Sequence, residues 1–180
     1  MKNDRIFITS DHHFCHERII SICGRPFADV EEMNETLASR WNSVVGKNGV
    51  VYHLGDFCLG NREQIQGWFK RLNGRIRLIV GNHDRYKPRD YLAVGFDRVY
   101  EYPICVRGFY WLSHAPMFLP VNSCYANVHG HIHQADYSDS FHFNACVEKT
   151  DYAPVLFDDV VGIFEEKLAA SVLSEENRKA

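Results

Sequence analysis

The sequence lacks any long apolar run, although 46% of its 180 residues are hydrophobic. No stretch approaches the roughly 18 consecutive apolar residues that a membrane-spanning helix requires. The segment Met1 to Arg5 is polar after its methionine and leads directly into a predicted strand, so it does not resemble an apolar secretion signal. We therefore expect a cytoplasmic protein with no membrane partner.

The sequence also lacks any C-x-x-C pair. This absence argues against a zinc ribbon or a thioredoxin-type redox site. With no secretion signal, the cysteines are expected to be reduced thiols rather than disulfides. There are six of them: Cys15, Cys23, Cys58, Cys105, Cys124 and Cys146. Cys15 and Cys58 lie close to polar motifs in the sequence, and two interpretations stay open for them: buried packing, which we favour, or oxidation-sensitive side chains at a site.

There is no excess of charge of one sign. Twenty basic and 23 acidic residues give a formal net charge of −3. Proteins that track extended nucleic acid usually carry a basic stripe, so such a partner is not expected, whereas a local basic patch stays open. Repeats, low-complexity segments and linkers are absent as well. We predict one domain spanning residues 1–180, with a C-terminal tail, 174–180, that frays.

The first half alternates strands with helices. Apolar strands are predicted at Arg5–Thr9, Val50–Leu54 and Ile76–Val80. Between them, Asp29 and Asn61 are typical N-caps of amphipathic helices. Their apolar faces show helical spacing and comprise Val30, Met33, Leu37, Trp41 and Val44 in the first helix, and Ile65, Trp68, Phe69 and Leu72 in the second.

The second half is richer in strands. Four short ones are predicted, at Ile104–Val106, Phe109–Leu112, Asn127–His129 and Phe141–Val147. Arg107-Gly108 is expected to form a hairpin turn, and Val160 to about Leu173 a final helix. Strand–helix alternation followed by a strand-rich half predicts an α/β (α+β) fold with two packed β-sheets and helices outside.

Polar motifs follow several of these strands. They offer carboxylate, amide and imidazole groups, the ligands that hold paired transition-metal ions. Each motif alone has a plain structural explanation, since Gly-Asp is most often a turn and alternating histidines can form a solvated strand face. The full set at strand ends makes coincidence improbable, because ligand sites form at the carboxyl ends of strands. The motifs are Asp11-His12-His13, Gly55-Asp56, Gly81-Asn82-His83-Asp84, Ser113-His114 and Gly130-His131-Ile132-His133.

This motif series resembles the calcineurin-like metallophosphoesterase superfamily, and the resemblance extends from about Ile6 to Val155. The stretches Ser10–His16, Arg25–Phe27 and Val51–Phe57 resemble a small stand-alone bacterial and phage branch. The resemblance implies a calcineurin-like four-layer αββα sandwich with two mixed β-sheets flanked by helices. It also implies two divalent metal ions, Mn first, with Fe, Zn, Ni or Co as alternatives.

The resemblance further implies the roles of individual residues. A hydroxide between the two ions would attack phosphorus in line. His83 would assist the leaving group as an acid, and Asp84 would orient His83. Seven ligands are implied: Asp11, His13 and His133 at one ion, Asn82, His114 and His131 at the other, and Asp56 between them.

For substrate contacts we select His16, Arg25 and Arg85, although a solvated surface arginine is the plainer alternative for either arginine. The expected function is hydrolysis of a small phosphodiester or phosphomonoester, with nucleotide-like molecules among the candidate substrates. The first alternative is a metal-dependent nuclease acting on DNA or RNA ends. The second, which the full set of ligand-type residues disfavours, is a non-catalytic binding scaffold.

Overall fold

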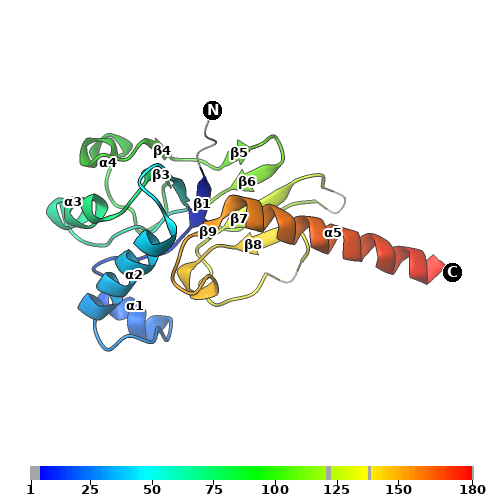
Figure 1. The fold of residues 1–180 in the computed structure, drawn as a ribbon, viewed down its shortest axis with the longest axis horizontal. Helices are drawn as coiled ribbons and strands as arrows, with labels where there is room; N and C mark the ends of the chain where they lie inside the picture. The colour runs from blue at the N-terminus through cyan, green and yellow to red at the C-terminus, as the bar shows by residue number, and fades with distance from the viewer. Residues whose placement is uncertain (1–4, 121–122, 138, 180) are drawn as a thin grey trace.

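Two mixed β-sheets pack face to face, with helices against them, in the computed structural model of the chain (Figure 1). The structure describes residues 5–120, 123–137 and 139–179, with side chains to residue 169. The expected architecture of two mixed sheets flanked by helices is therefore confirmed.

The first sheet contains five strands. Its first four strands run parallel, and the last pairs antiparallel with β1. The carboxyl ends of β1, β2 and β3 consequently meet at one edge, where the polar motifs begin. The strand order is β4 (Arg98–Tyr100), β3 (Arg75–Ile79), β2 (Val50–His53), β1 (Ile6–Thr9) and β9 (Val155–Leu156).

The second sheet contains four strands. Its last three strands run parallel, while β5 and β6 form the expected hairpin through Arg107-Gly108, both in the left-handed region. The strand order is β5 (Ile104–Val106), β6 (Tyr110–Leu112), β7 (Ala126–His129) and β8 (His142–Asn144).

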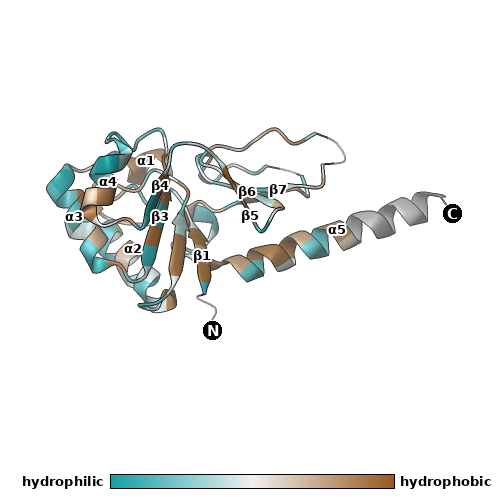
Figure 2. Ribbon diagram, turned by 90° about the horizontal axis from the view of Figure 1, so that it is seen from above, coloured by the Kyte–Doolittle hydropathy of each residue, from teal (hydrophilic) through white to brown (hydrophobic). Residues whose placement is uncertain are grey.

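Four helices pack against the first sheet through one apolar cluster, and their outward faces are hydrophilic (Figure 2). The Asp29 side chain accepts the Glu32 N–H at 2.8 Å, and Asn61 forms a reciprocal capping box with Gln64. These caps confirm the two expected helix starts. The helices are α1 (Glu17–Ile22), α2 (Val30–Val44), α3 (Arg62–Arg71) and α4 (Pro88–Val94).

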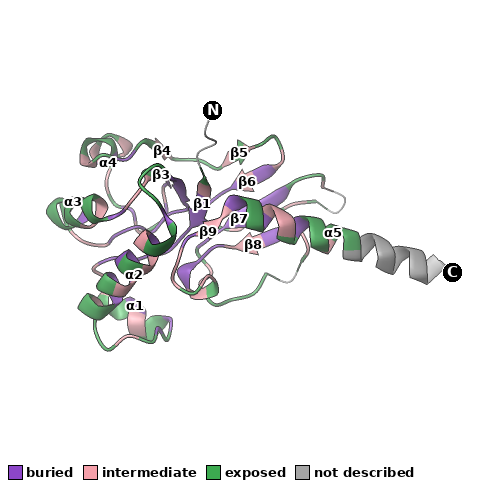
Figure 3. Ribbon diagram, viewed as in Figure 1, coloured by how far each residue is buried: buried purple, intermediate pink, exposed green. Residues whose placement is uncertain are grey.

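A second apolar cluster fills the space between the sheets, where the strands are buried (Figure 3). Ile8 of the first sheet, Leu54 directly after β2, and Leu112 and Val128 of the second sheet are fully buried there. Phe157, at the start of α5 (Phe157–Lys179), joins the same cluster. The two cores hold the strand ends rigidly, which gives the loops beyond them a fixed starting point.

Some element boundaries differ from expectation. The strand predicted to reach Val147 ends at Asn144, because Cys146 pairs with Ser10 and a 3₁₀ turn (Val147–Lys149) follows. Helix α5 begins three residues early, where Asp158 and Asp159 complement the helix dipole. It continues to Lys179, so residues expected to fray are helical, and Ala180 lies outside the described residues. The short elements α1, α4, β4 and β9 were not predicted. None of the helices described has the length and apolarity to cross a bilayer.

Candidate metal centre

The backbone that carries the polar motifs is strained. Five of the predicted ligands have positive φ, a region that costs non-glycine residues energy and is therefore uncommon for them. Such strain clusters at functional sites, because the surrounding structure must enforce it. The values are 59° at Asp11, 54° at His13, 57° at Asp56, 72° at His131 and 49° at His133.

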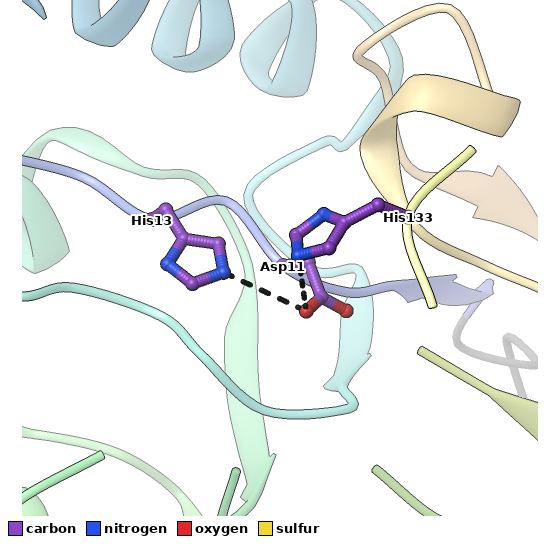
Figure 4. Close-up of side chains that lie close together, drawn as sticks. All are labelled: Asp11, His13 and His133. Carbon is purple, nitrogen blue, oxygen red and sulfur yellow. Dashed lines mark ion pairs between the residues drawn. The ribbon is translucent and has the colours of Figure 1, made fainter. Parts of the chain in front are cut away.

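Asp11, His13 and His133 form one group of potential metal ligands (Figure 4). Asp11 Oδ1 lies 3.7 Å from His13 Nε2 and 3.9 Å from His133 Nε2. One ligand atom from each residue lies within 4.8 Å of those of the other two. Asp11 and His13 are buried, and His133 is half-buried.

Asp56 lies between this group and a second one. Its Oδ2 atom is 3.4 Å from His13 Nε2 and 3.6 Å from His114 Nε2. Asp11, Asp56 and His114 also satisfy the same 4.8 Å criterion. A carboxylate in this position can contact two ions at once.

Asn82 and His131 complete the second group at the solvent-exposed side. Asn82 Oδ1 lies 2.8 Å from His114 Nε2, and His131 Nδ1 lies 3.2 Å from the same nitrogen. Both residues are exposed. The fold thus brings together all seven side chains that the sequence proposed as ligands.

The residues fit a metal, because two of their donor atoms lack a hydrogen-bond partner among the described residues. Asp11 Oδ1 and His13 Nε2 are buried and make no hydrogen bond within the described residues. Asp11 Oδ2, by contrast, accepts from the Ser10 hydroxyl at 2.5 Å and the His131 N–H at 2.8 Å. Burial opposes ionisation, yet His13 and His114 keep the pKa of Asp11 far below its ordinary value. A cation between these groups would satisfy both orphaned atoms.

Two glycines allow the close approach of these loops. A Cβ on Gly81 would collide with the Asp56 carboxylate, and a Cβ on Gly130 would collide with Ser10 and Asp11. The glycines in the motifs are therefore a packing requirement at these two positions.

Arg25 was predicted to contact phosphate, and this prediction is wrong. Its guanidinium is buried and donates to the backbone carbonyls of Asp11 at 2.7 Å and His12 at 2.9 Å. It also forms a buried ion pair with Glu148 at 2.7 Å. Arg25 is therefore committed to holding the first ligand loop, with its donors turned inward.

Glu148 was missed by the sequence analysis. Its Oε1 atom lies 3.0 Å from His133 Nδ1, so it orients the ring whose Nε2 faces Asp11. Burial opposes ionisation of Glu148, but His133 and Arg25 lower its pKa. Burial likewise opposes charge on His133, yet Glu148 raises its pKa. The sequence offers only an acidic residue two positions after Cys146, which by itself does not indicate a site.

Asp84 does not orient the His83 ring as predicted. Its Oδ2 accepts the backbone N–H groups of Asp56 at 2.8 Å and Gly81 at 2.9 Å. Its Oδ1 accepts from the Phe57 N–H at 3.1 Å and from the Tyr91 hydroxyl at 3.3 Å, so its hydrogen bonds among the described residues go to backbone groups and Tyr91. Burial and the charge of Asp56 raise its pKa to about 6.

His83 and His16 lie beside the first group. The His13 ring is 5.3 Å from the His83 ring and 5.2 Å from the His16 ring, measured between centroids. Burial lowers the pKa of His16 to about 4, with further lowering by His13 and His83. The Asp56 carboxylate accepts the His83 backbone N–H at 2.8 Å, which fixes the start of this loop. Arg85, two residues further on, is exposed.

His12 and His53 form a fully buried pair behind the ligands. His53 Nε2 lies 3.0 Å from His12 Nδ1, and His53 Nδ1 accepts the Gly55 N–H at 3.3 Å. This pair links the Asp11 and Asp56 loops from behind. Burial lowers the pKa of His53 to about 3, so the ring is neutral. Of the two cysteines near the motifs, Cys58 is buried and Cys15 is half-buried, and both are free thiols.

Two known proteins are similar to this chain, one along most of its length and one along less than half of it. MJ1445, an uncharacterized protein of Methanocaldococcus jannaschii, is 36% identical over 178 residues, covering 92% of this chain and 94% of that protein. The gene 66 protein of Mycobacterium phage L5 is 48% identical over 86 residues, covering 46% of this chain and 41% of that protein.

A solved structure shares the fold. The Aquifex aeolicus protein of unknown function AQ665 superposes with a TM-score of 0.70 at 26% identity, covering 89% of this chain and all of that one. The calcineurin-like phosphoesterase family model matches residues 4–153, a span that contains every ligand-type residue described above. The chain therefore belongs to the calcineurin-like phosphoesterase family, whose members use divalent metal ions to hydrolyse phosphoesters.

Proposed function

We propose that this chain hydrolyses a small phosphoester with two divalent metal ions. The observation that carries the proposal is the convergence of seven nitrogen and oxygen donors, among which Asp11 Oδ1 and His13 Nε2 are buried without a hydrogen-bond partner in the described residues. Mixed imidazole, carboxylate and amide ligation suits Mn, Fe, Zn, Co or Ni, and Mn is our first choice.

The proposed ligands divide into two sets. The first ion would be held by Asp11, His13 and His133, where burial and the Arg25–Glu148 pair support rigid binding. The second would be held on the exposed side by Asn82, His114 and His131, with Asp56 shared. When bound, the ions supply Lewis acidity and neutralise charge on the phosphoryl group.

His83 is the proposed proton donor to the leaving oxygen. Its half-buried ring packs against His13 and its backbone is anchored by Asp56, so it is positioned next to both sets of ligands. General acid catalysis of this kind contributes about 10²- to 10⁴-fold to the rate. His16, whose Nδ1 lies 3.2 Å from His13 Nδ1, is a proposed neighbour of the bound substrate.

The exposed side of the site supports an accessible phosphoester as substrate. Asn82 and His131 both face solvent, so a phosphoryl group reaches the second set of ligands without opening the core. The balanced charge of the chain gives no long basic track for duplex nucleic acid. A small or terminal phosphoester, either a phosphodiester or a phosphomonoester, is therefore the proposed substrate class.

The test measures metal content and turnover together. The chain is purified with Mn, its metal is counted by elemental analysis, and bis-p-nitrophenyl phosphate and p-nitrophenyl phosphate are assayed. We expect two ions per chain and Mn-dependent turnover, both reduced in Asp56→Asn. Asp159→Asn, an exposed change on α5, serves as the matched control and should leave both unchanged. Two ions without turnover of any phosphoester would refute catalysis and support a binding scaffold.

A further inference from the structure

A cleft of about 240 Å³ opens beside the proposed acid. One wall consists of residues that come shortly after Asp56 in the sequence, and the other consists of residues that come shortly after His83. It is lined by Cys58, Leu59, Gly60, Asn61, Arg85 and Tyr86. Two residues span at most about 7 Å, so the Cα of Cys58 lies within this distance of Asp56 and the Cα of Arg85 within it of His83.

The walls of the cleft are fixed relative to the site. Asp84 accepts the backbone N–H groups of Asp56 and Phe57, which directly precede the wall that begins at Cys58, and of Gly81, on the loop that leads to Arg85. Tyr86 is held as well, because the Arg62 guanidinium lies 5.5 Å from its ring centroid and is itself paired with Asp90. The cleft is therefore preformed and needs no large rearrangement to accept a group.

No carboxylate of the described residues pairs with Arg85. Arg25, Arg62 and Arg77 all pair with carboxylates. Arg85 is exposed and, among the described residues, forms no ion pair or side-chain hydrogen bond. Among the described residues, the lining of the cleft also contains no acidic side chain. A guanidinium in this setting matches the oxygens of a phosphate bidentately.

We propose that this cleft binds the leaving-group side of a phosphodiester and that Arg85 binds a second phosphate carried by that leaving group. The proposal rests on the proposed function and narrows its substrate class to phosphodiesters with a further phosphate, as in a phosphorylated dinucleotide. His83, which packs against His13 and lies two residues before Arg85 in the chain, would face the oxygen that joins the two parts of such a substrate.

The experiment compares thymidine dinucleotides that differ in one phosphate. The unphosphorylated dinucleotide and its 5′- and 3′-phosphorylated forms are assayed with the Mn-loaded chain. We expect one phosphorylated form to exceed the unphosphorylated one about tenfold in kcat/KM, the size of a charge-assisted hydrogen bond to an exposed arginine. Arg85→Gln should bring this ratio close to one, through a higher KM for the phosphorylated form. Arg89→Gln, an exposed arginine outside the cleft lining, should keep the ratio.

Binding measurements test the phosphate subsite independently of catalysis. Calorimetry with the Mn-loaded His83→Asn variant measures the affinity for the same three dinucleotides, with and without Arg85→Gln. A phosphate preference in binding without turnover by the unaltered chain would contradict catalysis but support the subsite. Equal binding of all three dinucleotides, or a preference that survives Arg85→Gln, would overturn the subsite.

Discussion

The Asp84 carboxylate accepts the Asp56 backbone N–H at 2.8 Å, and this bond joins two of the loops that form the metal centre. Asp56 is the proposed shared ligand, and Asp84 follows Asn82 and His83 on the neighbouring loop. Asp84 also accepts from Gly81 and Phe57. The carboxylate therefore connects the loops that follow two neighbouring strands through hydrogen bonds, rather than orienting the His83 ring.

Replacing Asp84 by Asn should weaken the hydrogen bonds that connect these two loops. An amide has a single acceptor oxygen, so at least one buried N–H loses its partner, at a cost of about 1–3 kcal/mol in the free energy of unfolding. Urea denaturation of the metal-free variant checks this, and Mn affinity should fall with it. Asp151→Asn, at an exposed position, is the control. A shifted pH–rate profile with unchanged stability would instead mean that Asp84 tunes His83.

Glu148→Gln should weaken the binding of one of the two metal ions selectively. The amide no longer raises the basicity of His133, and loss of such a partner typically lowers metal affinity about 10- to 100-fold. Elemental analysis after dialysis against low Mn should therefore find about one ion per chain instead of two. Glu166→Gln on α5 is exposed and should retain both. Retention of two ions by Glu148→Gln would show that His133 needs no such support.

His83→Asn should separate chemistry from metal binding. We expect kcat to fall about 10²- to 10⁴-fold for an alkyl leaving group, since no acid then protonates it. The loss should be much smaller for p-nitrophenolate, which leaves readily without a proton. Metal content should not change. An equal loss for both leaving groups would contradict the acid role.

Metal-free protein should become less stable as pH falls from 7 to 5. His53 has an unfolded pKa near 6.5 and a folded pKa of about 3, so only the unfolded chain gains a proton in this window. The contribution of neutral His53 to the free energy of unfolding is complete above the unfolded pKa of about 6.5. It is lost as the pH falls toward the folded pKa of about 3. At pH 5 this loss amounts to about 2 kcal/mol.

Chemical denaturation of chelator-treated protein at several pH values measures this loss. His53→Gln, which retains a donor toward His12, should show a shallower dependence by about that amount. An identical slope in both proteins would assign the pH dependence to other groups, such as His12, whose pKa is also lowered by burial.

The sequence by itself determined the elements with strong local signals. The caps at Asp29 and Asn61 and the apolar strands Ile6–Thr9 and Val50–His53 follow from hydrogen-bonding side chains and residue pattern, both local properties. Short elements such as β4 and β9 carry too few residues for a pattern, so only pairing with β3 and β1 defines them. The sequence also indicated the ligand types, because polar residues placed directly after buried strands cost free energy of folding unless they serve a site.

Only the tertiary structure decided which polar residues face the site and which support it. Arg25 was a candidate for phosphate contact because of its guanidinium, and the family resemblance implied that Asp84 orients His83, yet the fold turns both side chains toward backbone groups. Glu148 is 15 residues from His133 and 123 from Arg25, and no local pattern connects them. Long-range packing sets these contacts, since a side chain's direction depends on neighbours supplied by distant segments.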